Sequence, residues 1–135
     1  MSFAKDISSS NDITQITTAF DQLNLIDFQN PEDIYWLGYC YEHGIEVEKD
    51  EDKAFIHYQK SANMNNSNGI YQVGYCYHLG IGVETNRQEA FLHYQKSAEA
   101  GNSMGIFKTA ICYFYGIGVE KDEAKFYEWI EKELV

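Results

Sequence analysis

The sequence predicts an all-α solenoid of three helix-turn-helix repeats, preceded by a helix that caps the N-terminal end. Three observations support this fold class. One phrase recurs at a spacing of 36 residues, helix-capping residues flank each copy at the same spacing, and the hydrophobic fraction of 44% is high enough for a folded protein. Periods of about 20–50 residues are typical of stacked repeats, in which each unit packs on its neighbours. We therefore expect the function on the surface of the stack.

The N-terminal segment is expected to precede and cover the repeats. Residues 1–11, MSFAKDISSSN, are polar and rich in serine, and we expect them to be flexible. Residues 12–29 are predicted to form the capping helix. Asp12 and Gln15 match a capping box, and apolar residues follow at three- and four-residue intervals.

Each repeat is expected to be a pair of amphipathic helices. A capping asparagine starts the first helix, a glycine ends it after about three turns, and a second capping residue starts the second helix. The repeats span residues 30–65, 66–101 and 102–135. The capping asparagines are Asn30, Asn66 and Asn102, and the glycines that end the first helices are Gly44, Gly80 and Gly116. The residues that cap the second helices are Asp50, Asn86 and Asp122.

One face of the first helices is expected to form the core. The spacing i, i+3, i+4, i+7 of a buried helix face occurs in all three copies. These residues are Ile34, Leu37, Gly38 and Tyr41; Ile70, Val73, Gly74 and Tyr77; and Ile106, Thr109, Ala110 and Tyr113. The second helix of the third repeat differs from that of the second repeat, because Phe126 and Ile130 replace Ala90 and Tyr94 at the equivalent positions.

The charge and the cysteines restrict the partners and the compartment. The chain has 21 acidic and 10 basic residues, a net charge of −11, which argues against nucleic acid and favours a neutral or basic partner. No apolar run approaches the roughly 20 residues of a membrane-spanning helix, and the first ten residues show no secretory signal. Cys40, Cys76 and Cys112 are expected to be buried thiols, because equivalent positions of stacked repeats lie too far apart to pair. We expect a cytoplasmic protein with neither nucleic acid nor membrane as partner.

The repeated phrase resembles that of the Sel-one-like repeat (SLR) family, which is related to the tetratricopeptide repeats. The shared pattern is Leu-Gly-x-x-Tyr-x-x-Gly-x-Gly-Val, followed by Ala-x-x-x-Tyr and Ser/Ala-Ala, and it covers about residues 31–135. It is carried by Leu37, Gly38, Tyr41, Gly44 and Val47; by Val73, Gly74, Tyr77, Gly80, Gly82 and Val83; and by Ala110, Tyr113, Gly116, Gly118 and Val119. Glu46 replaces the second turn glycine of the first repeat. The resemblance implies a right-handed superhelix that acts as an adaptor or scaffold.

A second stripe lies beside the core face of the first helices, and the resemblance places it in a concave groove. This groove stripe consists of Tyr35, Tyr39 and Glu42; Tyr71, Tyr75 and His78; and Phe107, Ile111 and Phe114. Aromatic side chains with polar ends suit peptide recognition. The stripe contains no Lys or Arg, which argues against gripping an acidic chain terminus. We expect a protein or peptide partner with apolar anchors and a basic end.

Two other functions remain open. Secreted bacterial relatives with two cysteines in each repeat have been linked to β-lactam binding and hydrolysis, so the resemblance leaves a hydrolase-like groove as one alternative. The other is a purely structural segment of a longer array, with self-association through its apolar terminal repeat. We favour a non-catalytic protein-interaction module. No catalytic residue or cofactor is expected, and no metal, because the four histidines have no ligand at metal-binding spacing.

Overall fold

Six α-helices make up the part of the chain that the computed structural model describes, residues 28–134. They are α2 (Pro31–His43), α3 (Glu51–Asn63), α4 (Ser67–Leu79), α5 (Arg87–Glu99), α6 (Ser103–Tyr115) and α7 (Glu123–Leu134). Residues 1–11, predicted to be flexible, and nearly all of the predicted capping helix over residues 12–29 lie outside the described residues. Both therefore remain predictions.

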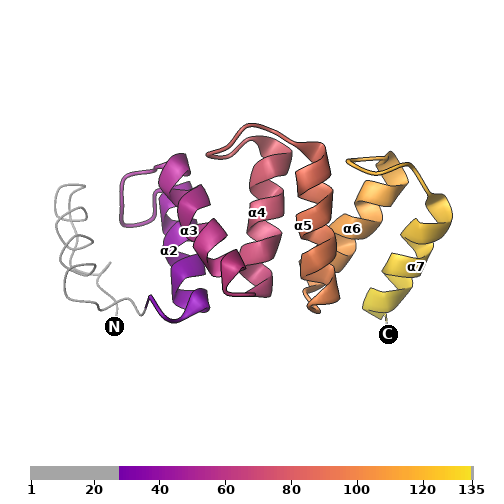
Figure 1. The fold of residues 1–135 in the computed structure, drawn as a ribbon, viewed down its shortest axis with the longest axis horizontal. Coiled ribbons are helices and arrows are strands. Elements are labelled where there is room, and N and C mark those ends of the chain that lie inside the picture. The colour runs from indigo at the N-terminus through magenta and orange to yellow at the C-terminus, as the bar shows by residue number, and fades with distance from the viewer. Residues whose placement is uncertain (1–27, 135) are drawn as a thin grey trace.

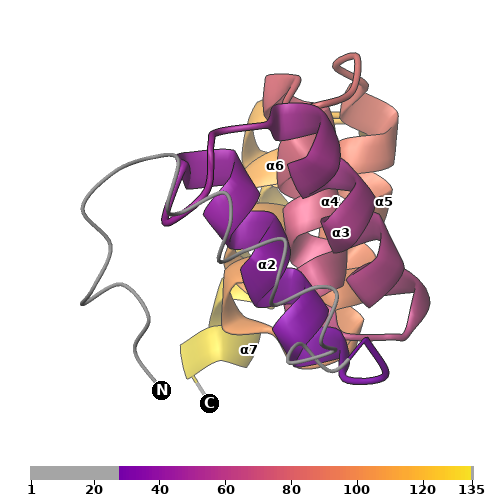
Figure 2. The ribbon, with the colours of Figure 1, turned by 90° about the vertical axis from the view of Figure 1, so that its left-hand side faces the viewer.

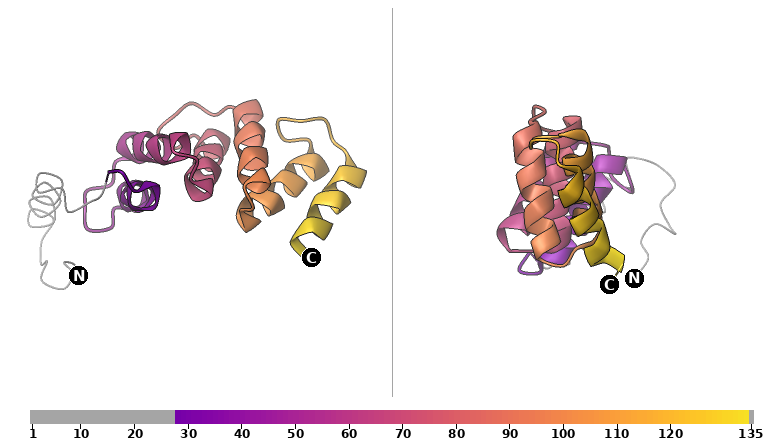
Figure 3. Two further views of the ribbon diagram at one scale, coloured as in Figure 1. Left: turned by 60° about the horizontal axis from the view of Figure 1, so that its bottom comes forward. Right: turned by 90° about the vertical axis from the view of Figure 1, so that its right-hand side faces the viewer.

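The helices pack in the order of the sequence and form a stack of three pairs (Figure 1). Each helix contacts the helices before and after it, and α2 also contacts α4, the first helix of the next pair. Viewed from the end that carries α2, the pairs lie behind one another (Figure 2). A turned view shows that the row of helices is curved (Figure 3). The all-α solenoid predicted from the 36-residue period is therefore confirmed.

Side chains cap the start of each pair as the sequence predicted. Oδ1 of Asn30 accepts a hydrogen bond from the backbone N–H of Glu32 at 2.9 Å, and Asn66 and Asn102 cap α4 and α6 in the same way. At the other end of α2, Gly44 has a φ of 65°. This left-handed conformation ends the helix and favours glycine, which has no Cβ atom.

Within a repeat, the two helices approach each other where a glycine faces a tyrosine. In the second repeat, a Cβ atom on Gly74 would lie 2.9 Å from Cδ1 of Tyr94 and 3.1 Å from the carbonyl oxygen of Ala90. Tyr94 is fully buried by this close approach. The third repeat has Ala110 and Ile130 at the positions of Gly74 and Tyr94. Because isoleucine is shorter than tyrosine, the exchange makes room for the alanine methyl group.

The second turn residue of each repeat has a left-handed backbone. The φ angle is 63° at Glu46, 67° at Gly82 and 68° at Gly118. A Cβ atom on Gly82 or Gly118 would overlap the carbonyl oxygen of Glu51 or Arg87, which begin α3 and α5. Glycine is therefore required where the turn packs on the preceding repeat. Among the described residues no repeat precedes Glu46, so this overlap does not arise there.

Most of the predicted core face is buried. Of its residues, all but Tyr77 and Ile106 are buried, and those two are half-buried. The ring of Tyr77 lies between the core clusters of neighbouring repeats and meets Phe55 at 5.6 Å between centroids. No residue of α7 is fully buried, although Phe126 and Trp129 pack on the second cluster. The buried apolar residues are therefore concentrated in the first two repeats.

Candidate partner-binding surface

The nine residues of the groove stripe lie on the three first helices. Helix α2 carries Tyr35, Tyr39 and Glu42, α4 carries Tyr71, Tyr75 and His78, and α6 carries Phe107, Ile111 and Phe114. Glu42 is buried, Phe107 is exposed, and the other seven residues are half-buried. The stripe thus presents partly accessible aromatic surface in every repeat, while its one carboxylate faces the protein interior.

The stripe residues of the first two repeats lie close together. The ring centroids of Tyr35 and Tyr39 are 6.5 Å apart, and those of Tyr71 and Tyr75 are 6.4 Å apart. Burial, followed by the neighbouring groups Tyr75, Tyr35 and Glu42, raises the pKa of Tyr71 to about 12. Gln72, the residue after Tyr71 in α4, donates a hydrogen bond to Glu42 of α2 at 3.3 Å. The contact between α2 and α4 therefore joins the two parts of the stripe.

Glu42 is held by neutral hydrogen-bond donors. Its Oε1 accepts a hydrogen bond from the hydroxyl of Tyr58 at 2.6 Å and from Nε2 of Gln72 at 3.3 Å. Its Oε2 lies 3.6 Å from Nε2 of His43. The residue is 7% exposed, so it links α2, α3 and α4 from within the protein. Helical spacing predicted Glu42 for the groove, but its hydrogen-bond partners lie 16 and 30 residues away in the sequence and were not predicted.

The equivalent position in the second repeat holds a histidine. His78 Nδ1 lies 3.1 Å from the hydroxyl oxygen of Tyr94, which repeats the contact of Glu42 with its tyrosine. Burial, followed by the positive charges of Lys108 and Arg87, lowers the pKa of His78. The second repeat therefore has a neutral or positive environment where the first has a buried carboxylate.

The third repeat continues the stripe with apolar residues. Phe114 occupies the position of Glu42 and His78, and its ring meets Phe126 at 5.0 Å and Tyr115 at 4.9 Å between centroids. Phe107 is 47% exposed. The character of the stripe thus changes from acidic and phenolic on α2 to apolar on α6.

Sequence reasoning missed a neighbouring set of residues, one position after the stripe. Trp36, Gln72 and Lys108 lie 36 residues apart on α2, α4 and α6. Trp36 is 52% exposed, and its ring contacts Tyr35 at 4.9 Å and Tyr39 at 5.5 Å between centroids. The repeat spacing could have identified this set, because each member directly follows the first stripe residue of its helix.

The first helix of each repeat carries one cysteine. Cys40, Cys76 and Cys112 are free thiols. Burial raises the pKa of Cys76 to about 12 and that of Cys112 to about 11, so both remain protonated at neutral pH and are weak nucleophiles. Over residues 28–134, no group of three His, Cys, Asp or Glu side chains could hold a metal ion. No helix in the same range is long and apolar enough to cross a membrane.

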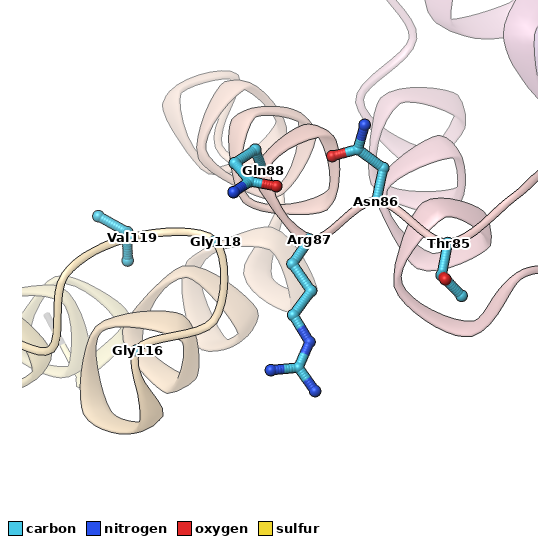
Figure 4. A pocket seen from close by; sticks show the side chains of 7 residues that line it. All are labelled: Thr85, Asn86, Arg87, Gln88, Gly116, Gly118 and Val119. Atoms are coloured by element: carbon cyan, nitrogen blue, oxygen red, sulfur yellow. The ribbon is translucent and has the colours of Figure 1, made fainter.

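An open hollow lies away from the stripe (Figure 4). Its volume is about 680 Å³, and it lies between residues 85–88 at the start of α5 and the turn after α6. Arg87 is the only charged one of its seven lining residues, and Gly116 and Gly118 line the opposite side. The lining therefore combines one cationic side chain with neutral side chains and backbone.

Solved structures share this fold. A Sel1 repeat protein from Oxalobacter formigenes aligns with a TM-score of 0.76 and 28% identity, over 79% of this chain and 43% of that one. A protective antigen of uropathogenic Escherichia coli strains, which displays an SLR fold, aligns with a TM-score of 0.81 and 28% identity, over 96% and 27%. Cysteine rich protein B of Helicobacter pylori aligns with a TM-score of 0.62 and 21% identity, over 80% and 86%. The chain spans less than half the length of the first two proteins.

A family profile assigns the repeats. The profile of the Sel1 repeat matches residues 31–66, 67–102 and 103–132, whereas the search of curated proteins returns no significant match. Sel1 repeats are commonly protein-interaction modules and generally non-catalytic scaffolds. The matched residues cover most of the chain and coincide with the three helix pairs of the right-handed solenoid. The chain therefore belongs to the Sel1 repeat family, in the tetratricopeptide-like superfamily.

Proposed function

We propose that this chain is a non-catalytic adaptor or scaffold that binds a peptide or helix of a partner protein in a concave groove lined by the groove stripe. The observation that carries the proposal is the accessibility of the stripe, in which eight of nine residues keep surface outside the core. Rigid rings with polar ends supply contact area at a low cost in side-chain entropy. The contact of α2 with α4 supports a position of the first helices on the inner side of the curve.

The partner is proposed to carry apolar anchors and a basic end. Phe107 and Phe114 offer apolar surface at one end of the stripe, and Glu42 is its carboxylate at the other. Glu32, outside the stripe but also on α2, adds negative charge and accepts hydrogen bonds from Asn66 and Asn68. The net charge of −11 would attract a basic segment before contact.

A peptide array incubated with the full chain would test this proposal. We expect enrichment of peptides that combine Phe, Leu or Ile with Arg or Lys at one end. Tyr39→Ala plus Tyr75→Ala should weaken the selected peptides at least about tenfold, because aromatic anchors dominate such interfaces. Tyr127→Ala is the matched control, since Tyr127 is 55% exposed and lies on α7, outside the stripe. Preference for acidic C-terminal peptides, or equal binding by the double variant, would contradict the proposal.

The cysteines favour a cytoplasmic protein without hydrolase activity. Each repeat has one free thiol, which suits a reducing compartment and differs from relatives with two cysteines in each repeat. We expect no turnover of the β-lactam nitrocefin by the full chain. If the purified Tyr39→Ala plus Tyr75→Ala variant turns over nitrocefin as fast as the wild-type chain, the turnover would come from a contaminant. If the variant loses the turnover, the result would favour the hydrolase alternative.

Self-association is a second candidate, favoured by the outer face of α7. Tyr127 and Leu134 are 55% and 80% exposed, whereas Phe91 and Ala98, at the same positions of α5, are 7% and 6% exposed beside α6. Exposed apolar patches of this kind mark interaction sites. Light scattering should show a mass that rises with concentration, and Tyr127→Glu plus Leu134→Glu should abolish the rise. A concentration-independent monomer would exclude self-association.

A further inference from the structure

We infer that Glu42 and the tyrosines around it form a subsite that receives an arginine side chain of the partner. The subsite lies where α2 meets α4 and consists of Glu42, Tyr35, Tyr39 and Tyr71. This inference rests on the proposed binding function and specifies the basic group that the groove takes. Four observations support it: an available oxygen, a carboxylate without a Lys or Arg partner in the described chain, aromatic walls and a difference between the repeats.

Glu42 keeps an acceptor oxygen for a ligand. Its Oε1 is occupied by the hydrogen bonds from Tyr58 and Gln72. Its Oε2 accepts no hydrogen bond from the residues described and has a longer contact with His43, at 3.6 Å. A carboxylate offers about four lone-pair sites, so Glu42 has capacity for further N–H donors. His43 is itself largely accessible, with 43% of its side chain exposed, and marks the side from which a ligand would approach.

The charge of Glu42 has no strong cationic partner in the described part of the chain. No Lys or Arg there forms an ion pair with it, although its side chain is only 8% exposed. A buried carboxylate has lost hydration, and neutral hydrogen bonds replace that hydration in part. An incoming guanidinium would supply the missing positive charge. Its N–H groups form a rigid fork that matches carboxylate oxygens, a geometry that a lysine ammonium lacks.

Aromatic rings border the approach to Glu42. The ring of Tyr39 meets His43 at 4.3 Å between centroids and lies 6.5 Å from the ring of Tyr35. The ring of Tyr35 lies 5.8 Å from that of Tyr58, whose hydroxyl donates to Glu42. Burial is the main cause of a raised pKa of Tyr35, and the neighbouring charges of Glu32, Tyr39 and Glu42 act in the same direction. Faces of such rings attract cations, and a desolvated cation–π contact contributes about 2 kcal/mol. A guanidinium at Glu42 would therefore contact rings as well as the carboxylate.

The equivalent positions of the other repeats differ in charge, which gives the site a direction. His78 replaces Glu42 in the second repeat and lies near Lys108, and Phe114 replaces it in the third. A cation is thus favoured at one end of the stripe and disfavoured in the middle. The bound segment would place its arginine over α2 and α4 and its apolar residues over α6.

The subsite can be tested with N-acetyl-arginine amide, using N-acetyl-citrulline amide as the neutral analogue of nearly the same shape. Aromatic NMR signals of the full chain report binding. We expect saturable shifts of the Tyr35, Tyr39 and Tyr71 signals with the arginine amide and none with the citrulline amide. Glu42→Gln should weaken arginine binding at least about tenfold, because it removes the charge while Oε1 can still accept from Tyr58. Glu84→Gln removes one charge from an exposed turn residue and should leave binding unchanged.

Equal shifts with the two amides, or unchanged arginine affinity in a Glu42→Gln protein of unchanged Tm, would overturn the inference. If Glu42→Gln does not fold, Tyr39→Leu replaces it, since it leaves the hydrogen bonds of Glu42 in place. That variant should weaken arginine binding several-fold, and an unchanged affinity would overturn the inference.

The amide experiment is independent of the peptide array. Array-selected peptides that depend on Tyr39 and Tyr75 but bind equally with arginine or citrulline would overturn the subsite alone. Saturable arginine binding without any selected peptide would support the subsite and contradict the proposed peptide partner.

Discussion

The first two repeats and the third build the same helix pair from different side chains. In the second repeat, Gly74 lets the ring of Tyr94 into the space between the helices, where it is fully buried. In the third, Ala110 fills part of that space and faces Ile130, which is half-buried. One geometry therefore accepts either a glycine with a tyrosine or an alanine with an isoleucine, provided that the two residues change together.

The difference follows the number of described helices that pack on the second helix of a repeat. Helix α5 packs between α4 and α6, and its residues Phe91, Tyr94 and Ala98 are all buried. Helix α7 packs on α6, and within the described residues no helix covers its outer face. The glycine and tyrosine pair thus occurs where the second helix is packed on both sides, as in α3 and α5, and the alanine and isoleucine pair occurs where it is packed on one, as in α7.

Gly118→Ala should have the largest effect on the contact of the third repeat with the second. The substitution adds a Cβ atom at a φ of 68° and places it against the carbonyl oxygen of Arg87. Left-handed strain and overpacking together should lower the free energy of unfolding by about 3 kcal/mol. Urea denaturation followed by circular dichroism measures this change.

Gly101→Ala is the matched control for that prediction. Gly101 has a φ of 86°, and a Cβ atom there would meet nothing within 4 Å. The control should lose about 1 kcal/mol, from backbone strain alone. Equal losses of unfolding free energy in the two variants would show that the close contact of Gly118 with α5 adds nothing to the cost of the substitution.

Gly74→Ala should reveal the pairing that distinguishes the repeats. The added methyl group lies 2.9 Å from the ring of Tyr94, so overpacking should cost about 1–3 kcal/mol. Adding Tyr94→Ile reproduces the alanine and isoleucine of the third repeat. The double variant should lose about 1 kcal/mol less free energy of unfolding than the two single variants lose together. A double-mutant cycle in denaturant would measure this difference. Additive changes would mean that the two positions are independent.

The fold was predictable because its signals are local and occur three times. The capping asparagines, the terminating glycines and the core spacing are each fixed by a residue's own helix or turn, and three copies confirm one another. The need for Gly118 is different, because it arises from the backbone of Arg87 in the preceding repeat. Sequence periodicity does not contain that contact.

The candidate site was predictable only in part. The angle around the helix identified the first helices and their aromatic residues, but not the direction of each side chain. Glu42 is buried by donors from two other helices, Tyr58 of α3 and Gln72 of α4, and one helix cannot reveal such partners. Trp36 lies beyond the groove stripe, on the side of α2 away from the core face, and is 52% exposed. It was missed because this position belongs to neither the core spacing nor the groove stripe.

Tyr58→Phe and Tyr94→Phe should differ because their partners differ in charge. The hydroxyl of Tyr58 donates to the buried carboxylate of Glu42, whereas that of Tyr94 lies beside the half-buried His78. Loss of a hydrogen bond to a charged group should cost about 2 kcal/mol, and loss of the neutral one about 1 kcal/mol. Thermal unfolding of both variants at neutral pH measures the difference. Equal losses would show that the charge of Glu42 does not strengthen its hydrogen bond.

The smallest effect is expected from the pH dependence of the second repeat. Burial, Lys108 and Arg87 lower the pKa of His78 from 6.5, so the folded chain binds a proton at this site less readily than the unfolded chain. The contribution of neutral His78 to stability is therefore fully present above about pH 7. This contribution is lost as the pH falls through 6.5 towards the lower pKa of His78 in the folded state. His78→Phe, which copies Phe114 of the third repeat, removes this site, so its Tm should fall less than that of the wild-type chain between about pH 7.5 and about pH 5.5. The other histidines are present in both proteins, so the difference between the two Tm changes isolates His78. Equal changes would mean that His78 titrates alike in the folded and unfolded chains, and that the second repeat tolerates a positive charge at the position where the third repeat has an apolar ring.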